Sequence, residues 1–441
     1  MNPETLIRRF KGHTAKIGVI GIGYVGLPLA LTFADGGFSV TGFDVDGAKI
    51  DAVNEGRSYI SYITGDVIQA ALDAGNLAAT TDFTGLTGMD VIILCVPTPL
   101  RAGREPDLQY VTATAETIAA HLRVGQLVVL ESTTYPGTSR EVMKPVLEKS
   151  GLTSGRDFLL AYSPEREDPG NDQFRTSAIP KVVGGDGEEA LRAATALYDE
   201  IVVETVPVST LEVAEAVKLT ENIFRAVNIA LVNEMKVVYG KLGIDVWEVL
   251  DAAKTKPFGY MPFYPGPGLG GHCIPIDPFY LTWRANQAGA DTRFIELAGE
   301  INTAMPGHVV EALGAALADC GGVLTGAKIL CVGLAYKKNV NDTRESPALT
   351  LIEMLEDAGA RVAYHDPLVA KIPVTREHPA LAGRRSVDLT EDVLAGFDAA
   401  LIVTDHDAID FEALVAGSRL VIDTRGATRT ISNNRDRIRS A

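Results

Sequence analysis

The chain has 441 residues, of which 46% are hydrophobic and 22% charged. This composition is typical of globular proteins, and the length predicts two or three domains. The formal net charge of −17 at pH 7 argues against nucleic acid as a partner, because lysine and arginine hold phosphate backbones. A phosphorylated small molecule stays compatible with this charge, since one local cluster of N–H groups binds a diphosphate.

The cysteines are few and widely spaced, and they form no CxxC pair: Cys95, Cys273, Cys320 and Cys331. This spacing predicts neither a disulfide framework nor a metal site, and reduced thiols fit best. The first sixteen residues lack the apolar core of a secretory signal, and the apolar stretch after them is too short to cross a bilayer. We therefore expect a cytoplasmic protein without a membrane partner.

The first half of the chain alternates short apolar segments with longer amphipathic ones. The helical pattern at 107–122 lies between such segments. Predicted strands, rich in β-branched residues and bounded by Gly, Pro or Asp, are 16–23, 38–44, 90–96, 126–132 and 158–164. Alternation of this kind predicts a parallel sheet with helices on both faces.

The middle of the chain is helical. Residues 211–242 contain no proline and one glycine, which predicts a single long helix, and further helical segments continue to about residue 302. A long, largely apolar helix between two α/β units is expected to serve as a packing spine and a subunit interface. We therefore expect a homodimer or a higher homo-oligomer.

Strand–helix alternation resumes after a break that contains three glycines. The predicted strands are 327–334, 361–366, 399–405 and 419–426. The fold class is thus α/β, with two Rossmann-like parallel-sheet domains joined by a long central helix and a helical dimerisation core. The expected domains are 1–210, 211–305 and 320–441, and the polar residues 427–441 are expected to form a frayed tail.

A dinucleotide-binding turn follows the first strand. Gly21, Gly23 and Gly26 form a GxGxxG motif that also opens a helix, so the glycines allow a pyrophosphate to approach the helix N-terminus. Asp44 ends the next strand, where a carboxylate binds the ribose hydroxyls and favours NAD over NADP. Lys49 lies one turn further and is expected to steady the same ribose or the diphosphate. Asp366 ends a similar strand in the second half without a GxGxxG before it, so it is interpreted as a strand-end cap.

The glycine- and proline-rich segment 263–280 carries the most reactive side chains. It contains His272, Cys273 and Asp277. A loop rich in glycine lets the backbone approach a ligand closely. A loop cysteine beside a histidine is a candidate nucleophile, and a structural thiol is the alternative.

Two further sets of polar residues are candidates for a site. Lys218 and Asn222 share one face of the long helix; the lysine either lies at the surface or stabilises negative charge on a reacting oxygen. Polar turns also follow three predicted strands, at 97–99, 131–137 and 163–171. Ligands of open α/β sheets bind at such strand ends, although these residues also favour ordinary turns.

Together these segments resemble the UDP-glucose/GDP-mannose dehydrogenase family over nearly the whole chain. The motifs occur in the family's order: GIGYVGLPLA at 21–30, VPTP at 96–99, ESTTYPGT at 131–138, YSPERE at 162–167, AVKLTENIFRAVNIALVNE at 216–234, GLGGHCIPIDP at 268–278 and GLAYKKNVNDTRESPA at 333–348. The resemblance implies an N-terminal NAD-binding domain, a helical dimerisation domain and a C-terminal domain for the UDP-sugar. It also implies a two-step oxidation of the sugar's primary alcohol to a carboxylate, with NAD as the cofactor.

The resemblance assigns a role to each candidate residue. Cys273 would be the nucleophile, Lys218 and Asn222 would stabilise oxyanions, and Asp277 would support proton transfer. The hydrolytic water would be positioned by Thr133 and Glu165. Cofactor contacts are expected from Gly21, Gly23, Tyr24, Val25, Gly26, Asp44, Lys49, Thr98, Thr133 and Arg344. Substrate contacts are expected from Glu165, Arg166, Lys218, Asn222, Gly270, Tyr336 and Lys337.

The sequence departs from the UDP-glucose branch of the family at two positions. That branch usually carries a serine before the cysteine and a lysine before the aspartate, where this chain has His272 and Ile276. GGHCIPIDPFYLTW and SPEREDPGN instead resemble the branch that acts on UDP-N-acetylhexosamines, UDP-N-acetylglucosamine above all. UDP-N-acetylmannosamine and UDP-glucose are the alternative substrates.

Two other functions remain open at this point. A non-catalytic NAD-binding protein would need none of Cys273, Lys218 and Asp277. A single-step alcohol dehydrogenase would release an aldehyde and produce one NADH per sugar, whereas the two-step reaction produces two.

Overall fold

The computed structural model describes residues 3–60, 62–101, 103–166, 176–271, 274–375 and 377–441. The predicted nucleophile Cys273 and its neighbour His272 lie outside the described residues. Contacts group the chain into two compact units, with residues 1–221 and 279–291 in unit 1 and residues 222–278 and 292–441 in unit 2. The three-domain division expected from the sequence stays a prediction.

Unit 1 is built on a sheet whose strand order, among the described residues, is β3-β2-β1-β4-β5-β6-β7-β8. Its strands are β1 (Lys16–Ile20), β2 (Ser39–Phe43), β3 (Leu77–Thr80), β4 (Val91–Leu94), β5 (Leu127–Leu130), β6 (Leu159–Tyr162), β7 (Lys181–Gly185) and β8 (Thr205–Pro207). The predicted parallel pairing is confirmed from β3 through β6. β7 pairs antiparallel with β6, and β3, β7 and β8 have no counterpart among the predicted strands.

Helices cover both faces of this sheet, and they are α1 (Glu4–Lys11), α2 (Gly26–Asp35), α3 (Gly47–Asn54), α4 (Gly65–Asp73), α5 (Gln109–His121), α6 (Lys144–Leu147) and α7 (Glu188–Tyr198). Alternate residues of β4 show the two layers. Val91 and Ile93 belong to the core under α2 and α7, whereas Ile92 and Leu94 belong to the core under α5 and α6. This alternation is the one expected for a strand buried on both faces.

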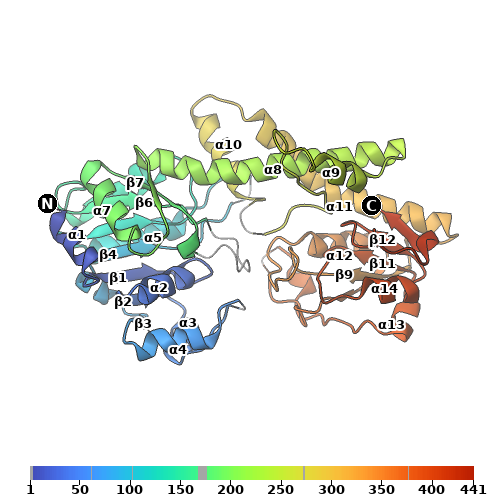
Figure 1. The fold of residues 1–441 in the computed structure, drawn as a ribbon, viewed down its shortest axis with the longest axis horizontal. Helices are drawn as coiled ribbons and strands as arrows, with labels where there is room; N and C mark the ends of the chain where they lie inside the picture. Colours follow the sequence, from blue (N-terminus) through green and yellow to red (C-terminus); the bar gives the residue numbers. More distant parts are fainter. Residues whose placement is uncertain (1–2, 61, 102, 167–175, 272–273, 376) are drawn as a thin grey trace. The chain divides into compact units, whose positions relative to one another are not determined.

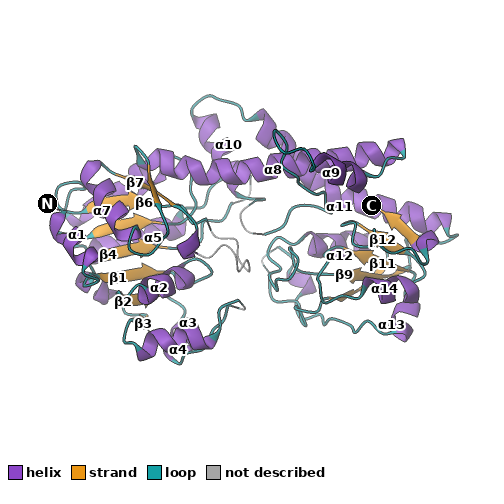
Figure 2. Cartoon of the chain, in the orientation of Figure 1, coloured by secondary structure: helices purple, strands orange, loops and turns teal. Residues whose placement is uncertain are grey.

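Unit 2 repeats the plan with a parallel sheet in the order β10-β9-β11-β12-β13. Its strands are β9 (Lys328–Val332), β10 (Arg361–His365), β11 (Ala399–Ile402), β12 (Val421–Asp423) and β13 (Ile438–Ser440). Its helices include α9 (Val246–Ala253), α11 (Arg293–Asp319), α12 (Pro347–Asp357), α13 (Glu391–Ala395) and α14 (Phe411–Gly417). Helices flank the strands of each unit (Figure 2), which confirms the predicted α/β class.

The C-terminal segment 427–441 contributes the strand β13 to this sheet, so the predicted frayed tail is wrong. β13 pairs with β12, and the side chain of Ile431 and the terminal Ala441 are buried. Two apolar residues, Ile431 and Ile438, pack against a core of unit 2 despite the many polar neighbours. Their burial anchors a segment that composition alone marks as a tail.

The long helix α8 (Leu211–Leu242) has the bounds predicted from the sequence, and α10 (Asp277–Gln287) follows the glycine-rich loop (Figure 1). The absence of proline and the continuous pattern of apolar residues explain why α8 is unbroken. Among the described residues we find no helix whose length and hydropathy would let it traverse a bilayer.

Candidate active site

The glycines of the turn between β1 and α2 are explained by different physical requirements. Gly21 has φ 87°, and a Cβ there would lie 2.4 Å from the carbonyl oxygen of Cys95. A Cβ on Gly26 would lie 1.9 Å from the carbonyl oxygen of Gly21, so close packing requires both glycines. A Cβ on Gly23 would meet no atom within 4 Å. Packing therefore leaves Gly23 unexplained, whereas close approach of a pyrophosphate to the helix N-terminus explains it.

Asp44, at the end of β2, lies beside this turn. Its carboxylate accepts hydrogen bonds from the backbone N–H of Ile22 at 3.1 Å, from that of Asp46 at 3.0 Å and from Lys49 Nζ at 3.2 Å. Because a carboxylate offers about four acceptor positions, Asp44 retains capacity for a ribose hydroxyl. The Tyr59 hydroxyl donates to the carbonyl of Ile22, and burial raises the pKa of Tyr59. Tyr59 was not among the predicted site residues, because nothing in its sequence surroundings marks it.

The turns after β4 and β5 are joined to each other. Ser132 Oγ donates to the carbonyl of Val96 at 2.8 Å and accepts from its N–H at 2.9 Å. The carbonyl of Thr98 accepts a hydrogen bond from the Tyr280 hydroxyl. Thr98 is buried and Thr133 is half-buried. Two of the predicted polar turns thus meet at the carboxyl edge of the sheet of unit 1.

Lys218 and Glu165 are in contact in unit 1, although 53 residues separate them in the sequence. Lys218 Nζ donates to the backbone carbonyl of Glu165, and it lies 3.3 Å from the carboxylate Oε2 of the same residue. The lysine side chain is 5% exposed, so the surface interpretation of Lys218 is wrong. Arg166 pairs with Glu221 on α8, with an N–O distance of 2.7 Å.

A buried triad that was not predicted lies beside these residues. The Glu131 carboxylate accepts from Lys181 Nζ at 2.8 Å and from the Tyr198 hydroxyl at 2.5 Å, and burial together with Glu131 raises the pKa of Tyr198 well above its ordinary value. Glu131 and Lys181 border a small pocket, whose other lining residues are Val25, Leu29, Pro164, Glu165, Arg166, Ile179 and Pro180. Glu131 follows the apolar strand β5 and Lys181 begins the apolar strand β7. A charged residue at the end of an apolar strand is a signal of a polar site, but it does not show that these two residues pair.

In unit 2, Asn222 Nδ2 donates to Asp277 Oδ2 at 2.5 Å. Asn222 is fully buried and Asp277 is 3% exposed. Arg225 donates to Asn222 Oδ1, which orients the amide so that its NH₂ group faces the carboxylate. Asp277 is the first residue of α10, where the N–H groups of a helix N-terminus stabilise a carboxylate. The structure therefore joins two predicted catalytic residues, of which Asp277 follows Cys273 by four positions in the sequence.

The glycine-rich loop contacts the loop after β9 within unit 2. The backbone N–H of Gly271 donates to the carbonyl of Arg344 at 3.1 Å. A Cβ on Gly270 would lie 2.6 Å from Cβ of Tyr336, so glycine permits this close approach. Arg344 makes a two-pronged ion pair with Asp342, at 3.0 and 2.6 Å. Tyr336 and Arg344, predicted to contact substrate and cofactor, thus lie against the loop that leads to the predicted nucleophile.

Comparison with known proteins places these features in a family. Three domains of the UDP-glucose/GDP-mannose dehydrogenase family match this chain. The NAD binding domain matches residues 15–202, the central domain residues 212–304 and the UDP binding domain residues 330–430. The UDP-N-acetyl-D-mannosamine dehydrogenase of Pyrococcus horikoshii is 35% identical over 416 residues, which cover 93% of this chain and 95% of that protein. The UDP-N-acetyl-D-glucosamine 6-dehydrogenase of Pseudomonas aeruginosa is 38% identical over 366 residues, covering 82% and 85%. A solved structure of the Pyrococcus horikoshii UDP-D-ManNAc dehydrogenase has a TM-score of 0.87 at 34% identity, covering 96% and 98% of the two chains.

An NAD-binding domain combined with a UDP-binding domain defines an NAD-dependent nucleotide-sugar 6-dehydrogenase. The chain belongs to the UDP-glucose/GDP-mannose dehydrogenase family. The family and the NAD cofactor expected from the motifs are confirmed.

Proposed function

We propose that the enzyme oxidises the C6 alcohol of UDP-N-acetylglucosamine to the uronate through a covalent intermediate on Cys273. The motifs GGHCIPIDPFYLTW and SPEREDPGN support this substrate, as does the similarity to the Pseudomonas aeruginosa UDP-N-acetyl-D-glucosamine 6-dehydrogenase. The remaining predicted contacts of the NAD and the UDP-sugar, and the division into NAD-binding, dimerisation and UDP-sugar-binding domains, are part of the same proposal.

The contact between Lys218 and Glu165 is the observation that carries the catalytic assignment. A buried lysine that pairs with a carboxylate at the end of a strand is poised to meet negative charge on a substrate oxygen. Glu165 would position the hydrolytic water together with Thr133. The buried pair of Asn222 and Asp277 adds an amide for the oxyanion and a carboxylate for proton transfer.

Bound NAD would supply the acceptor for each of the two hydrides that leave C6. Removal of the first hydride and the hydroxyl proton gives an aldehyde. The Cys273 thiolate then forms a C–S bond to the aldehyde carbon as the C=O π bond opens. Lys218 and Asn222 stabilise the resulting oxyanion, which takes up a proton to give the thiohemiacetal. Loss of the second hydride and the hydroxyl proton leaves a thioester. Water cleaves the C–S bond, which releases the carboxylate and returns the thiolate of Cys273, with protons passing to Asp277 and to solvent.

UDP-N-acetylmannosamine is the second candidate substrate. The similarity to the Pyrococcus horikoshii UDP-N-acetyl-D-mannosamine dehydrogenase extends over 93% of this chain, and the structure of that protein superimposes with a TM-score of 0.87. The two sugars differ in stereochemistry at C2, so a few pocket side chains decide between them.

Replacement of the predicted nucleophile tests this mechanism. Cys273→Ser should reduce net acid production by about 10³-fold or more, because serine is a far weaker nucleophile at neutral pH. Binding of NAD and of UDP-sugar, measured by calorimetry, should persist. Cys320→Ser is the matched control, since Cys320 is an exposed free cysteine, and it should leave acid production unchanged.

Acid formation by Cys273→Ser at the rate of the unmodified enzyme would remove Cys273 from its assigned role. Accumulation of aldehyde by the unmodified enzyme, with one NADH per sugar, would instead favour a single-step alcohol dehydrogenase.

A further inference from the structure

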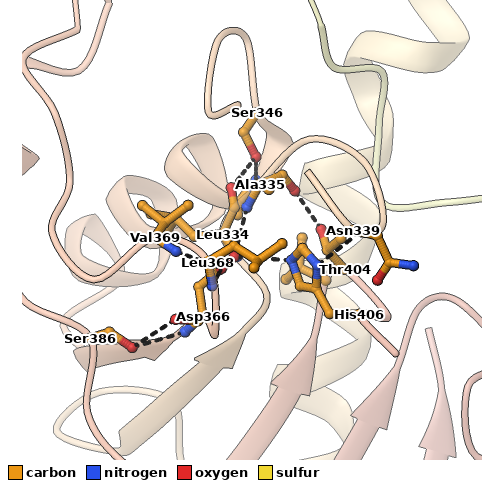
Figure 3. Close-up of polar contacts among 12 residues, drawn as sticks. Leu334, Ala335, Asn339, Ser346, Asp366, Leu368, Val369, Ser386, Thr404 and His406 are labelled. Atoms are coloured by element: carbon orange, nitrogen blue, oxygen red, sulfur yellow. Dashed lines mark hydrogen bonds and ion pairs between the residues drawn. The ribbon is translucent and has the colours of Figure 1, made fainter. Parts of the chain in front are cut away.

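Both carboxylate oxygens of Asp366, the residue after β10, accept hydrogen bonds from backbone N–H groups. Oδ2 accepts from the N–H groups of Leu334 at 2.6 Å and Ala335 at 3.0 Å (Figure 3). Oδ1 accepts from the N–H groups of Leu368 at 2.8 Å and Val369 at 2.9 Å. These bonds hold the start of the loop after β9 against the start of the loop after β10.

His406 completes this cluster and is fully buried. Its Nε2 lies 3.1 Å from Asp366 Oδ2, and its Nδ1 accepts the backbone N–H of Asn339 at 3.0 Å. Because Nδ1 is an acceptor, the hydrogen-bond network assigns the ring proton to Nε2, which donates to the carboxylate. The bonds from His406, Leu334 and Ala335 outweigh burial and hold the pKa of Asp366 below its ordinary value. A side chain 40 residues further along the chain thus connects Asp366 to the middle of the loop after β9.

The same loop is held at further points by the residues after β11. Thr404 Oγ1 donates to the carbonyl of Ala335 at 2.6 Å. The side chain of Asn339 donates to Asp407 Oδ2 at 2.6 Å and accepts the N–H of Asp407 at 3.0 Å. Glu345 has φ 49°, a region that glutamate enters only when its surroundings enforce it. Asn339 has φ 61°, and asparagine adopts this region more readily. The contacts with Thr404 and Asp407 therefore hold this loop in place.

We propose that His406 is a positioning residue for the UDP-sugar, acting through the loop 333–346. This loop carries Tyr336 and Lys337, which the proposed function assigns to the substrate, so the inference rests on that assignment. The bond from the Asn339 N–H fixes the backbone two residues after Lys337. His406 itself is buried beneath the loop and acts through it.

Two substitutions separate the two hydrogen bonds of the imidazole. In His406→Asn, the amide oxygen can take the place of Nδ1 and accept the Asn339 N–H. In His406→Gln, the amide nitrogen can take the place of Nε2 and donate to Asp366, while the bond to Asn339 is lost. We expect His406→Gln to raise the KM for the UDP-sugar and the dissociation constant of UDP by about tenfold. We expect His406→Asn to stay within about threefold of the unmodified enzyme, and the NAD dissociation constant to be unchanged in both.

A second variant keeps the inference testable if changes at His406 prevent folding. Thr404→Val removes the bond to the Ala335 carbonyl without touching Asp366, and it should raise the same two constants with little change in kcat. Equal substrate constants in His406→Gln and the unmodified enzyme would overturn the inference. So would a greater loss in His406→Asn than in His406→Gln, since the bond to Asp366 alone would then matter. Failure of the unmodified enzyme to bind UDP would instead contradict the proposed function.

Discussion

Asp44 and Asp366 occupy corresponding places in the two units but differ in their capacity to accept further hydrogen bonds. Asp44 accepts two backbone N–H groups and one lysine, whereas Asp366 accepts four backbone N–H groups and His406. A carboxylate has about four acceptor positions. The carboxylate of unit 1 can therefore bind a ribose hydroxyl, and that of unit 2 is saturated by its own chain.

Asp44→Asn should weaken NAD binding by about tenfold, because the amide loses the charge and one acceptor for the ribose. Discrimination against NADP should fall as well, since the repulsion of its extra phosphate is lost. The dissociation constants are measured by titration calorimetry. Asp51→Asn on the exposed side of α3 is the control, and unchanged NAD affinity in Asp44→Asn would contradict the placement of the ribose.

The sequence predicts these two aspartates but not their partners. Each aspartate follows a predicted strand, so a site at Asp44 and a strand-end cap at Asp366 can both be inferred from the local sequence pattern. The cap at Asp366 is confirmed. His406 and the pair of Glu131 and Lys181 could not be inferred. Their roles depend on contacts between residues 40 and 50 positions apart, and strand pairing and loop packing alone create such contacts.

Helix α8 places a lysine in the interior of unit 2. Lys236 is 5% exposed, and its Nζ donates to the carbonyl of Thr424 at 3.1 Å. Burial lowers the pKa of Lys236 to about 7; the neighbouring Arg425 adds to this effect and Asp423 opposes it. The unfolded chain therefore binds more protons than the folded chain between pH of about 7 and the ordinary lysine pKa, so stability should rise with pH across that window.

Lys236→Met should remove this rise. Between pH 7 and 9 the unmodified enzyme should gain up to about 1.4 kcal/mol per pH unit relative to the variant, which would be visible as a difference in melting temperature. Lys241→Met, at an exposed lysine near the end of the same helix, should keep the pH dependence of the unmodified enzyme. Parallel pH profiles for Lys236→Met and the unmodified enzyme would contradict a neutral buried lysine.

The elements differ in how far the sequence determines them. Both ends of α8 were predictable, because 32 residues of helical pattern contain no proline. β7 and β8 were not, since β7 runs antiparallel to β6 and strand–helix alternation predicts only parallel neighbours. β13 was missed because Ile438 is an isolated apolar residue among charged ones, and only the edge of a completed sheet gives it a partner.

Exposed apolar side chains recur every seventh residue on α8. Phe224, Leu231 and Val238 are 46%, 51% and 47% exposed, and a spacing of seven keeps them on one face of the helix. A stripe of this kind is expected at a helix–helix interface between subunits. We therefore predict that the enzyme is a homodimer or a higher homo-oligomer in which α8 faces a second copy.

Leu231→Glu should dissociate this assembly, because it places a charge in the centre of the stripe. Light scattering of the purified protein measures the mass directly. Val67→Glu on α4 is a control at a valine with the same exposed fraction, 51%, and it should leave the mass unchanged. A monomeric unmodified enzyme, or an unaltered mass for Leu231→Glu, would contradict an interface on α8.

The proposed reaction is a four-electron oxidation of a UDP-N-acetylhexosamine. The measurement that tests it most directly is NADH formed per sugar consumed, with NAD and a panel of UDP-N-acetylglucosamine, UDP-N-acetylgalactosamine, UDP-N-acetylmannosamine and UDP-glucose. We predict the fastest turnover with UDP-N-acetylglucosamine, with two NADH and one carboxylate per sugar. One NADH per sugar with release of aldehyde would contradict a four-electron oxidation.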